Sequence, residues 1–239
     1  MSSIVLGSTG LVGGQIVKVA KQSTTLEKLI TITRRPLPSE ETEDSSSATS
    51  KVISIVESDS SKWPNLITEQ TKTGPIDVFI TALGTTRAKA GSAEKFKEID
   101  YGINYDNAKS AKENGVKTLI LVSSGGANPD SRFLYFQTKG QLEKDIEALE
   151  FDRTVILRPG VLLGERENYH GFGTSAATFV GRLIKGTFMA SLMRPIEGHE
   201  VATVAIDFAE KAIKGELKDK VTIIEPADLV KLANTLSGK

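Results

Sequence analysis

The sequence predicts an α/β protein of the Rossmann type, with a doubly wound parallel sheet and a small C-terminal cap on the substrate side. Three observations predict it. Strand-like and helix-like segments alternate from the first residue, β-branched side chains crowd the strand-like segments, and a glycine-rich turn follows the first of them. Buried parallel strands carry such near-continuous apolar runs, and the helices between them return the chain to the same edge of the sheet.

The expected elements follow in regular order. Residues 3–6 form a short apolar run that ends at Gly7, and apolar side chains recur at helical spacing over residues 11–21. Further strands are predicted at 29–33, 52–56, 78–83, 118–123 and 154–157, and helices at 92–114 and 133–149. We therefore expect a single nucleotide-binding domain over residues 1–239, in which residues 165–200 and 222–239 form the cap.

Composition excludes several classes of protein. The chain has 239 residues, 30 basic and 30 acidic side chains, no cysteine and two histidines. The balanced charge argues against a nucleic-acid binder, and the absence of thiols excludes a disulfide framework and cysteine-based metal or nucleophile chemistry. His170 and His199 are far apart in the sequence and are interpreted as surface residues, so no metal site is predicted.

Residues 38–51 interrupt the order of elements between the second and third strands. Residues 39–50 contain four acids and almost no apolar side chain. Burial of so little apolar surface does not offset the entropy lost on ordering, so we interpret 38–51 as a disordered surface insertion. A loop regulated by phosphorylation is the alternative.

The glycine-rich turn, Gly7–Gly13, opens the first predicted helix. Gly7 permits the tight exit from the strand, Gly10 lets a pyrophosphate approach bare backbone, and Gly13 lets the helix pack closely on the sheet. Because the spacing is G-x-x-G-x-x-G, the dinucleotide fingerprint is not met literally, and a plain packing turn is the alternative. The residues predicted to bind the nucleotide here are Gly7, Ser8, Thr9, Gly10, Leu11 and Val12.

Two arginines follow the second predicted strand, where an NAD-specific site carries an acid. The guanidiniums of Arg34 and Arg35 can grip a 2′-phosphate in bidentate fashion, which indicates NADPH rather than NADH. A solvated basic pair at a strand end is the alternative. Asp59, just beyond the third strand, is placed to meet the adenine edge of the cofactor.

A serine, a tyrosine and a lysine follow the fifth predicted strand. Ser124 comes directly after it, and Tyr135 and Lys139 share one face of the next predicted helix. We expect the Lys139 ammonium to lower the pKa of the Tyr135 phenol, normally about 10, so that the phenol serves as a general acid. Ser124 would hydrogen-bond the carbonyl oxygen on which negative charge grows. The predicted catalytic residues are therefore Ser124, Tyr135 and Lys139.

Together these motifs resemble the atypical short-chain dehydrogenases/reductases and, within them, the family of the oxidoreductase-like Tat-interacting protein and its fungal relatives found in the mitochondrial proteome. The resemblance spans nearly the whole chain apart from the insertion. Its matching segments are Gly7–Gly13, Arg34–Arg35, 82–87, 122–124, 128–133, Tyr135 with Lys139, 157–160 and 163–166.

The resemblance implies a Rossmann fold that binds NADP(H), with Lys139 also holding the nicotinamide ribose. It adds Ala82, Leu83, Gly84 and Pro159 to the cofactor site. Asn104 lies near a position where the superfamily often keeps an asparagine. The fungal members are peripheral proteins of the mitochondrial outer membrane, which implies that location here, with a cytoplasmic protein as the alternative. No substrate comes with the family.

The two ends of the chain carry further signals. The first 26 residues lack acids and contain Lys18 and Lys21, as a mitochondrial presequence does, but cleavage there would remove the first strand and the glycine-rich turn. We therefore predict that this segment is retained. Residues 168–196 contain no acid and have apolar side chains at helical spacing near Arg182 and Lys185. A membrane-surface contact or a lid over the substrate is one interpretation, and a cap helix packed on the sheet is the other.

The sequence as a whole predicts an NADPH-dependent reductase of a small-molecule carbonyl substrate. The alternative belongs to another class of protein. It is a nucleotide-binding scaffold or sensor whose NADPH occupancy governs the binding of a protein partner, with little or no turnover.

Overall fold

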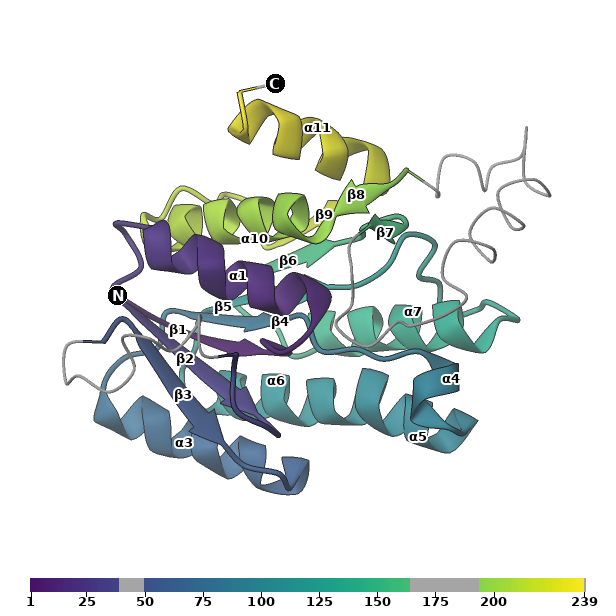
Figure 1. Cartoon of the computed structure of the whole chain (residues 1–239), viewed down its shortest axis with the longest axis horizontal. Coiled ribbons are helices and arrows are strands. Elements are labelled where there is room, and N and C mark those ends of the chain that lie inside the picture. The colour runs from purple at the N-terminus through teal and green to yellow at the C-terminus, as the bar shows by residue number, and fades with distance from the viewer. Residues whose placement is uncertain (39–49, 164–193, 239) are drawn as a thin grey trace.

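The computed structural model describes residues 1–38, 50–163 and 194–238. Its main sheet is parallel and seven-stranded, in the order β3-β2-β1-β4-β5-β6-β9 (Figure 1). The order runs outward in both directions from the neighbouring strands β1 and β4, so the sheet is doubly wound. The predicted α/β fold of the Rossmann type is confirmed.

The first half of the sheet contains β1 (Ser2–Leu6), β2 (Lys28–Thr33), β3 (Val52–Val56) and β4 (Val78–Thr81). Helix α1 (Leu11–Gln22) joins β1 to β2, and the 3₁₀ turn η1 (Ser60–Lys62) with α3 (Trp63–Thr73) joins β3 to β4. The register of β1 and β2 ends at Leu6 and Ile32, so the chain leaves both strands at the same edge of the sheet.

The second half adds β5 (Thr118–Val122), β6 (Arg153–Leu157) and β9 (Val221–Ile224). Between β4 and β5 lie α4 (Arg87–Ala90), α5 (Ala93–Lys97), the π-helical turn η2 (Glu98–Ile103) and α6 (Asn104–Glu113). Helix α7 (Leu134–Glu147) joins β5 to β6. Helices α10 (Gly198–Ile213) and α11 (Pro226–Leu236) flank β9 in sequence, and β7 (Leu162–Leu163) pairs with β8 (Ile196–Glu197) in a small second sheet.

Helices cover both faces of the sheet. On one face α1 packs against α10, with α11 outside α10, and on the other face lie α3, α6 and α7 (Figure 1). Because side chains alternate along a strand, each face has its own core. Val5 and Ile16 belong to one core, and Ile4, Trp63 and Leu142 belong to the other.

The structure corrects two details of the expected elements. Residues 222–224, expected in the cap, belong to the edge strand Val221–Ile224, which pairs with β6 and is half-buried apart from the exposed Ile223. The helix expected over 92–114 contains a π-helical turn at Glu98–Ile103. Residues 165–193 of the first cap segment, with His170 and the predicted basic helix near Arg182 and Lys185, lie outside the described residues, as do residues 39–49 of the insertion. Within the ranges that are described, no helix combines the length and the apolar character that crossing a bilayer requires.

Candidate active site

The glycine-rich turn lies between β1 and α1, at the carboxyl edge of the sheet. Gly7 has φ +84°, and a Cβ there would lie 2.6 Å from the Ala82 carbonyl carbon, whereas a Cβ on Gly13 would lie 2.1 Å from the Gly7 oxygen. These close approaches hold the turn against both α1 and the segment after β4. Gly10 caps α1 without a side-chain hydrogen bond, so the first N–H groups of the helix are available to an anion.

The remaining residues of the turn differ in exposure. Ser8 is fully buried, and its hydroxyl donates to the Val5 carbonyl at 3.4 Å, so Ser8 shapes the turn from inside. Val12 is also buried, whereas Thr9 and Leu11 are half-buried and Gly10 is exposed. The surface that the turn offers to a phosphate is therefore Thr9–Leu11.

Two exposed arginines flank this turn. Arg34 and Arg35 follow β2 directly, and the Arg35 carbonyl accepts the Thr33 hydroxyl at 2.7 Å. Because β2 is the neighbour of β1, both arginines lie at the edge of the sheet where the glycine-rich turn also lies.

Asp59 has a local role that the sequence did not suggest. Its carboxylate caps η1, accepting the Ser61 hydroxyl at 2.6 Å and the Ser61 N–H at 3.0 Å. These two hydrogen bonds hold the pKa of the Asp59 carboxyl below its ordinary value. Asp59 remains exposed, so the cap leaves it at the surface beyond β3.

Ser124 lies in the turn after β5, between the ends of β4 and β6. Its hydroxyl donates to the Gly125 carbonyl at 3.3 Å, and the Gly125 N–H donates to the Pro159 carbonyl at 2.8 Å. Pro159 itself is buried. Ser124, Pro159 and the Ala82–Gly84 segment thus follow three neighbouring strands of the sheet and lie at its carboxyl edge.

Tyr135 lies in the first turn of α7, and its side chain is held between aromatic rings. Its ring centroid is 5.9 Å from that of Phe96 on α5 and 5.4 Å from that of Phe136. Phe96 is 1% exposed and Tyr135 is 39% exposed, so one edge of the phenol is packed and the other is open. Such tilted ring contacts fix a ring's orientation more tightly than contact area alone.

Lys139, one helical turn after Tyr135, is buried and paired with an acid. Its Nζ lies 2.8 Å from Asp100 Oδ1, and the two side chains are 5% and 1% exposed. Burial disfavours the charged ammonium, but the Asp100 carboxylate, with smaller contributions from Tyr135 and Glu143, outweighs burial and raises the pKa of Lys139. A Cβ on Gly84 would lie 3.4 Å from the same Nζ, so the ammonium lies against the turn after β4.

Asp100 is a member of this charged pair that was not predicted from the sequence. It lies in η2, and its Oδ2 accepts the Thr85 N–H at 2.7 Å. The sequence does contain a signal for Asp100: it and Asn104 recur at a spacing of four residues with the apolar Phe96 and Ala108, and so lie on the same face of the helix. An acid within a core-facing stripe requires a buried partner.

A second buried acid on α7 extends this charged arrangement. Glu143, one turn beyond Lys139, accepts Arg158 Nη2 at 2.5 Å and Arg158 Nε at 3.2 Å, and Arg158 Nη1 donates to Glu225 at 2.6 Å. The hydrogen bonds to Glu143, and to a smaller extent the one to Glu225, raise the pKa of Arg158 above its ordinary value. Asp100, Lys139, Glu143, Arg158 and Glu225 therefore form a series of alternating charges from η2 to the ends of β6 and β9.

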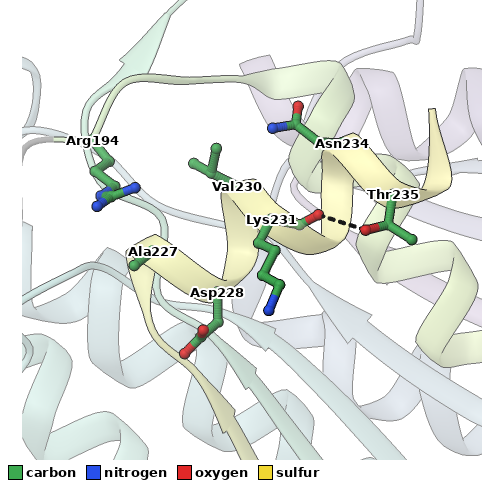
Figure 2. A pocket seen from close by; sticks show the side chains of 7 residues that line it. All are labelled: Arg194, Ala227, Asp228, Val230, Lys231, Asn234 and Thr235. Atoms are coloured by element: carbon green, nitrogen blue, oxygen red, sulfur yellow. Dashed lines mark hydrogen bonds between the residues drawn. The ribbon is translucent and has the colours of Figure 1, made fainter. Parts of the chain in front are cut away.

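Two cavities of the described chain are lined by other residues than these. One of about 480 Å³ lies beside α11, and Figure 2 shows Arg194 on one side of it and Lys231, Asp228 and Asn234 on the helix. The other, of about 360 Å³, lies between η2 and α7 and is lined by residues that include Tyr101 and Gln141. Neither is lined by Ser124, Tyr135 or Lys139, so chemistry rather than cavity size identifies the candidate site.

The fold defines a class: the chain has a Rossmann fold like that of nucleotide-sugar epimerases and short-chain dehydrogenases. UDP-glucose 4-epimerase of Thermotoga maritima superposes with a TM-score of 0.65 at 14% identity, covering 100% of this chain and 83% of that one. A short chain dehydrogenase family protein of Francisella tularensis superposes with a TM-score of 0.62 at 15% identity, covering 96% and 98%. At these identities the likeness concerns the fold.

Within this class the chain belongs to the FMP52 family. It is 56% identical over 237 residues to protein FMP52, mitochondrial, of Candida albicans, covering 99% of this chain and 100% of the relative. It is 41% identical over 239 residues to protein FMP52, mitochondrial, of Saccharomyces cerevisiae, covering 99% and 98%. The family model HIM1 matches residues 69–185. The resemblance to fungal mitochondrial relatives is confirmed.

Proposed function

We propose that this protein is an NADPH-dependent reductase of a carbonyl substrate. The observation that carries the proposal is the buried Lys139 ammonium, one helical turn from Tyr135 and directly against the turn at Gly84. Lysine is almost never fully buried without a partner, because removing an ammonium from water is costly. In this position the ammonium can serve both a cofactor ribose and the phenol.

The residues at the carboxyl edge of the sheet fit NADPH. The absent side chains at Gly7 and Gly13 allow the turn its close contacts, and the free N–H groups of α1 suit a pyrophosphate. Exposed Arg34 and Arg35 would pair with the 2′-phosphate, and Lys139 with the hydroxyls of the nicotinamide ribose. When bound, NADPH supplies the hydride.

Side chains of the protein then stabilise the negative charge that develops on the substrate oxygen. Tyr135 donates its phenolic proton to the carbonyl oxygen as the carbonyl carbon gains the hydride, and Ser124 donates a hydrogen bond to the same oxygen. The Lys139 ammonium stabilises the phenolate that remains. The exposed edge of Tyr135 is the edge from which a substrate would approach.

The direct test is NADPH oxidation by the purified protein against a panel of aldehydes and ketones. Tyr135→Phe removes the proton donor but keeps the ring contacts with Phe96 and Phe136, so turnover should fall by about 10²–10⁴-fold while NADPH affinity is retained. Tyr105→Phe is the matched control, because Tyr105 stacks on Tyr101 at 5.7 Å, outside the site. Turnover that survives Tyr135→Phe contradicts the mechanism.

A second candidate function is an NADPH-binding sensor for a protein partner. The observation that favours it is Phe133, which is 71% exposed two residues from Tyr135. Exposed aromatic side chains beside a ligand site are typical of protein contact surfaces. NADPH binding without turnover on any carbonyl, together with partner capture that depends on NADPH and is lost in Phe133→Ser, would favour the sensor.

We further propose a peripheral location at the mitochondrial outer membrane with the N-terminus retained. The support is the mitochondrial naming of the relatives and the central place of β1 and the glycine-rich turn in the sheet. Carbonate extraction of isolated mitochondria and N-terminal sequencing of the mature protein test both points. A mature protein that begins after residue 20 contradicts the retained N-terminus.

A further inference from the structure

A buried carboxylate joins the two sides of the candidate site. Asp100 is fully buried, its Oδ1 lies 2.8 Å from Lys139 Nζ, and its Oδ2 accepts the Thr85 N–H at 2.7 Å. A Cβ on Gly84 would lie 3.2 Å from Oδ1. One carboxylate thus contacts helix α7 through Lys139 and the segment after β4 through Thr85.

The local backbone explains how Asp100 reaches this position. It lies in η2, a π-helical turn, and such turns widen a helix and recur at functional sites. Asn104 fastens the turn to β4, because its Oδ1 accepts the Thr81 hydroxyl at 2.5 Å and its Nδ2 lies 3.2 Å from the Leu83 oxygen and 3.1 Å from the Ile99 oxygen. The π-helical turn and the hydrogen bonds of Asn104 together hold the Asp100 carboxylate next to Gly84.

We propose that Asp100 is the positioning residue of this site, holding the Lys139 ammonium against the turn at Leu83–Thr85 so that it meets the cofactor ribose. The inference rests on the proposed function. An ammonium has three N–H donors, so its ion pair with Asp100 at 2.8 Å leaves donors for a ribose hydroxyl and the Tyr135 oxygen. Without the carboxylate, the flexible lysine stem has no fixed direction.

The charged groups around Lys139 provide a test of the positioning role of Asp100. The groups that face its ammonium are Asp100 from η2, and Tyr135 and Glu143 from α7 itself, while the turn at Gly84 presents no charge. Burial lowers the pKa of Lys139 and Asp100 is the main opposing influence, so neutralising Asp100 should let Lys139 lose its proton at lower pH. A purely structural role for Asp100 predicts lower stability but no such change in protonation.

The experiment is an NMR titration of protein carrying ¹³Cε-labelled lysine, with the Lys139 signal assigned by its loss in Lys139→Arg. Asp100→Asn keeps the shape of the side chain and an acceptor for Thr85, and should lower the Lys139 midpoint by at least about one pH unit. Asp106→Asn, an exposed acid on α6, is the matched control and should leave the midpoint unchanged. An Asp100→Asn midpoint equal to that of the wild type overturns the proposal.

NADPH affinity gives the second readout. It should fall at least about ten-fold in Asp100→Asn, as expected for a misdirected charged hydrogen bond, and remain unchanged in Asp106→Asn. A wild-type protein that does not bind NADPH contradicts the proposed function, whereas the Lys139 titration still decides the role of Asp100.

If Asp100→Asn does not fold, the pairing of Asp100 with Lys139 is tested by the melting temperatures of Asp100→Glu, Lys139→Gln and Asp100→Asn/Lys139→Gln. A double variant more stable than Lys139→Gln supports the pairing, and one no more stable overturns it.

Discussion

The two sides of the candidate site are built in different ways. On the nucleotide side, Gly7–Gly13 and the arginines Arg34 and Arg35 offer backbone N–H groups and exposed side chains that lie within a few residues of a strand end. On the side proposed to be catalytic, Lys139 and Asp100 come from two different helices and are both buried. A side that depends on local backbone should tolerate changes elsewhere in the chain, whereas a side held by buried charges should be sensitive to any change in its partners.

The largest expected effect tests the buried charges. Glu143→Gln removes the carboxylate that Arg158 contacts with two nitrogens, and the Glu143 side chain is only 4% exposed. Breaking a buried pair from one side costs about 3–5 kcal/mol, and because Arg158 keeps Glu225 we expect a loss near the lower limit, about 3 kcal/mol of unfolding free energy. Urea denaturation measures the loss.

The matched control for this change lies on the same helix. Glu147→Gln changes the same charge at an exposed position one turn along α7, and should alter the unfolding free energy by less than about 0.5 kcal/mol. Equal losses of unfolding free energy in Glu143→Gln and Glu147→Gln would contradict the idea that one side of the site depends on buried charges.

The next effect in size tests the nucleotide side. Gly13→Ala places a Cβ 2.1 Å from the Gly7 oxygen, so α1 must move away from the turn. We expect about 2 kcal/mol less unfolding free energy and at least about ten-fold weaker NADPH binding, because the N–H groups of α1 move with the helix. Gly74→Ala, at the end of α3, is the control, since a Cβ there meets nothing within 4 Å. Retained NADPH affinity in Gly13→Ala would show that the turn does not hold the cofactor.

The same contrast explains what could be predicted from the sequence. The strands β1 to β6, the glycine-rich turn and the Tyr135–Lys139 pair follow from local patterns of apolar residues and from spacing along a helix. Asp100 could not be assigned a role, because its partner depends on the packing of η2 against α7 and on the wide π-helical turn, and neither has a reliable local pattern. Strand β9 was missed for a related reason, since an edge strand of four residues has few buried side chains to mark it.

The smallest expected effect concerns cofactor choice. Arg34 and Arg35 are exposed, so in the proposed complex each would pair with the 2′-phosphate in a solvated setting, and Arg34→Ala or Arg35→Ala should each weaken NADPH binding by about ten-fold. NADH lacks the 2′-phosphate, so its affinity should not change, and the double variant should lose the preference for NADPH. Lys18→Ala, an exposed cation on α1, controls for loss of charge alone. Equal losses for both nucleotides would show that the arginines act on the turn, and that the nucleotide side also depends on contacts beyond its local backbone.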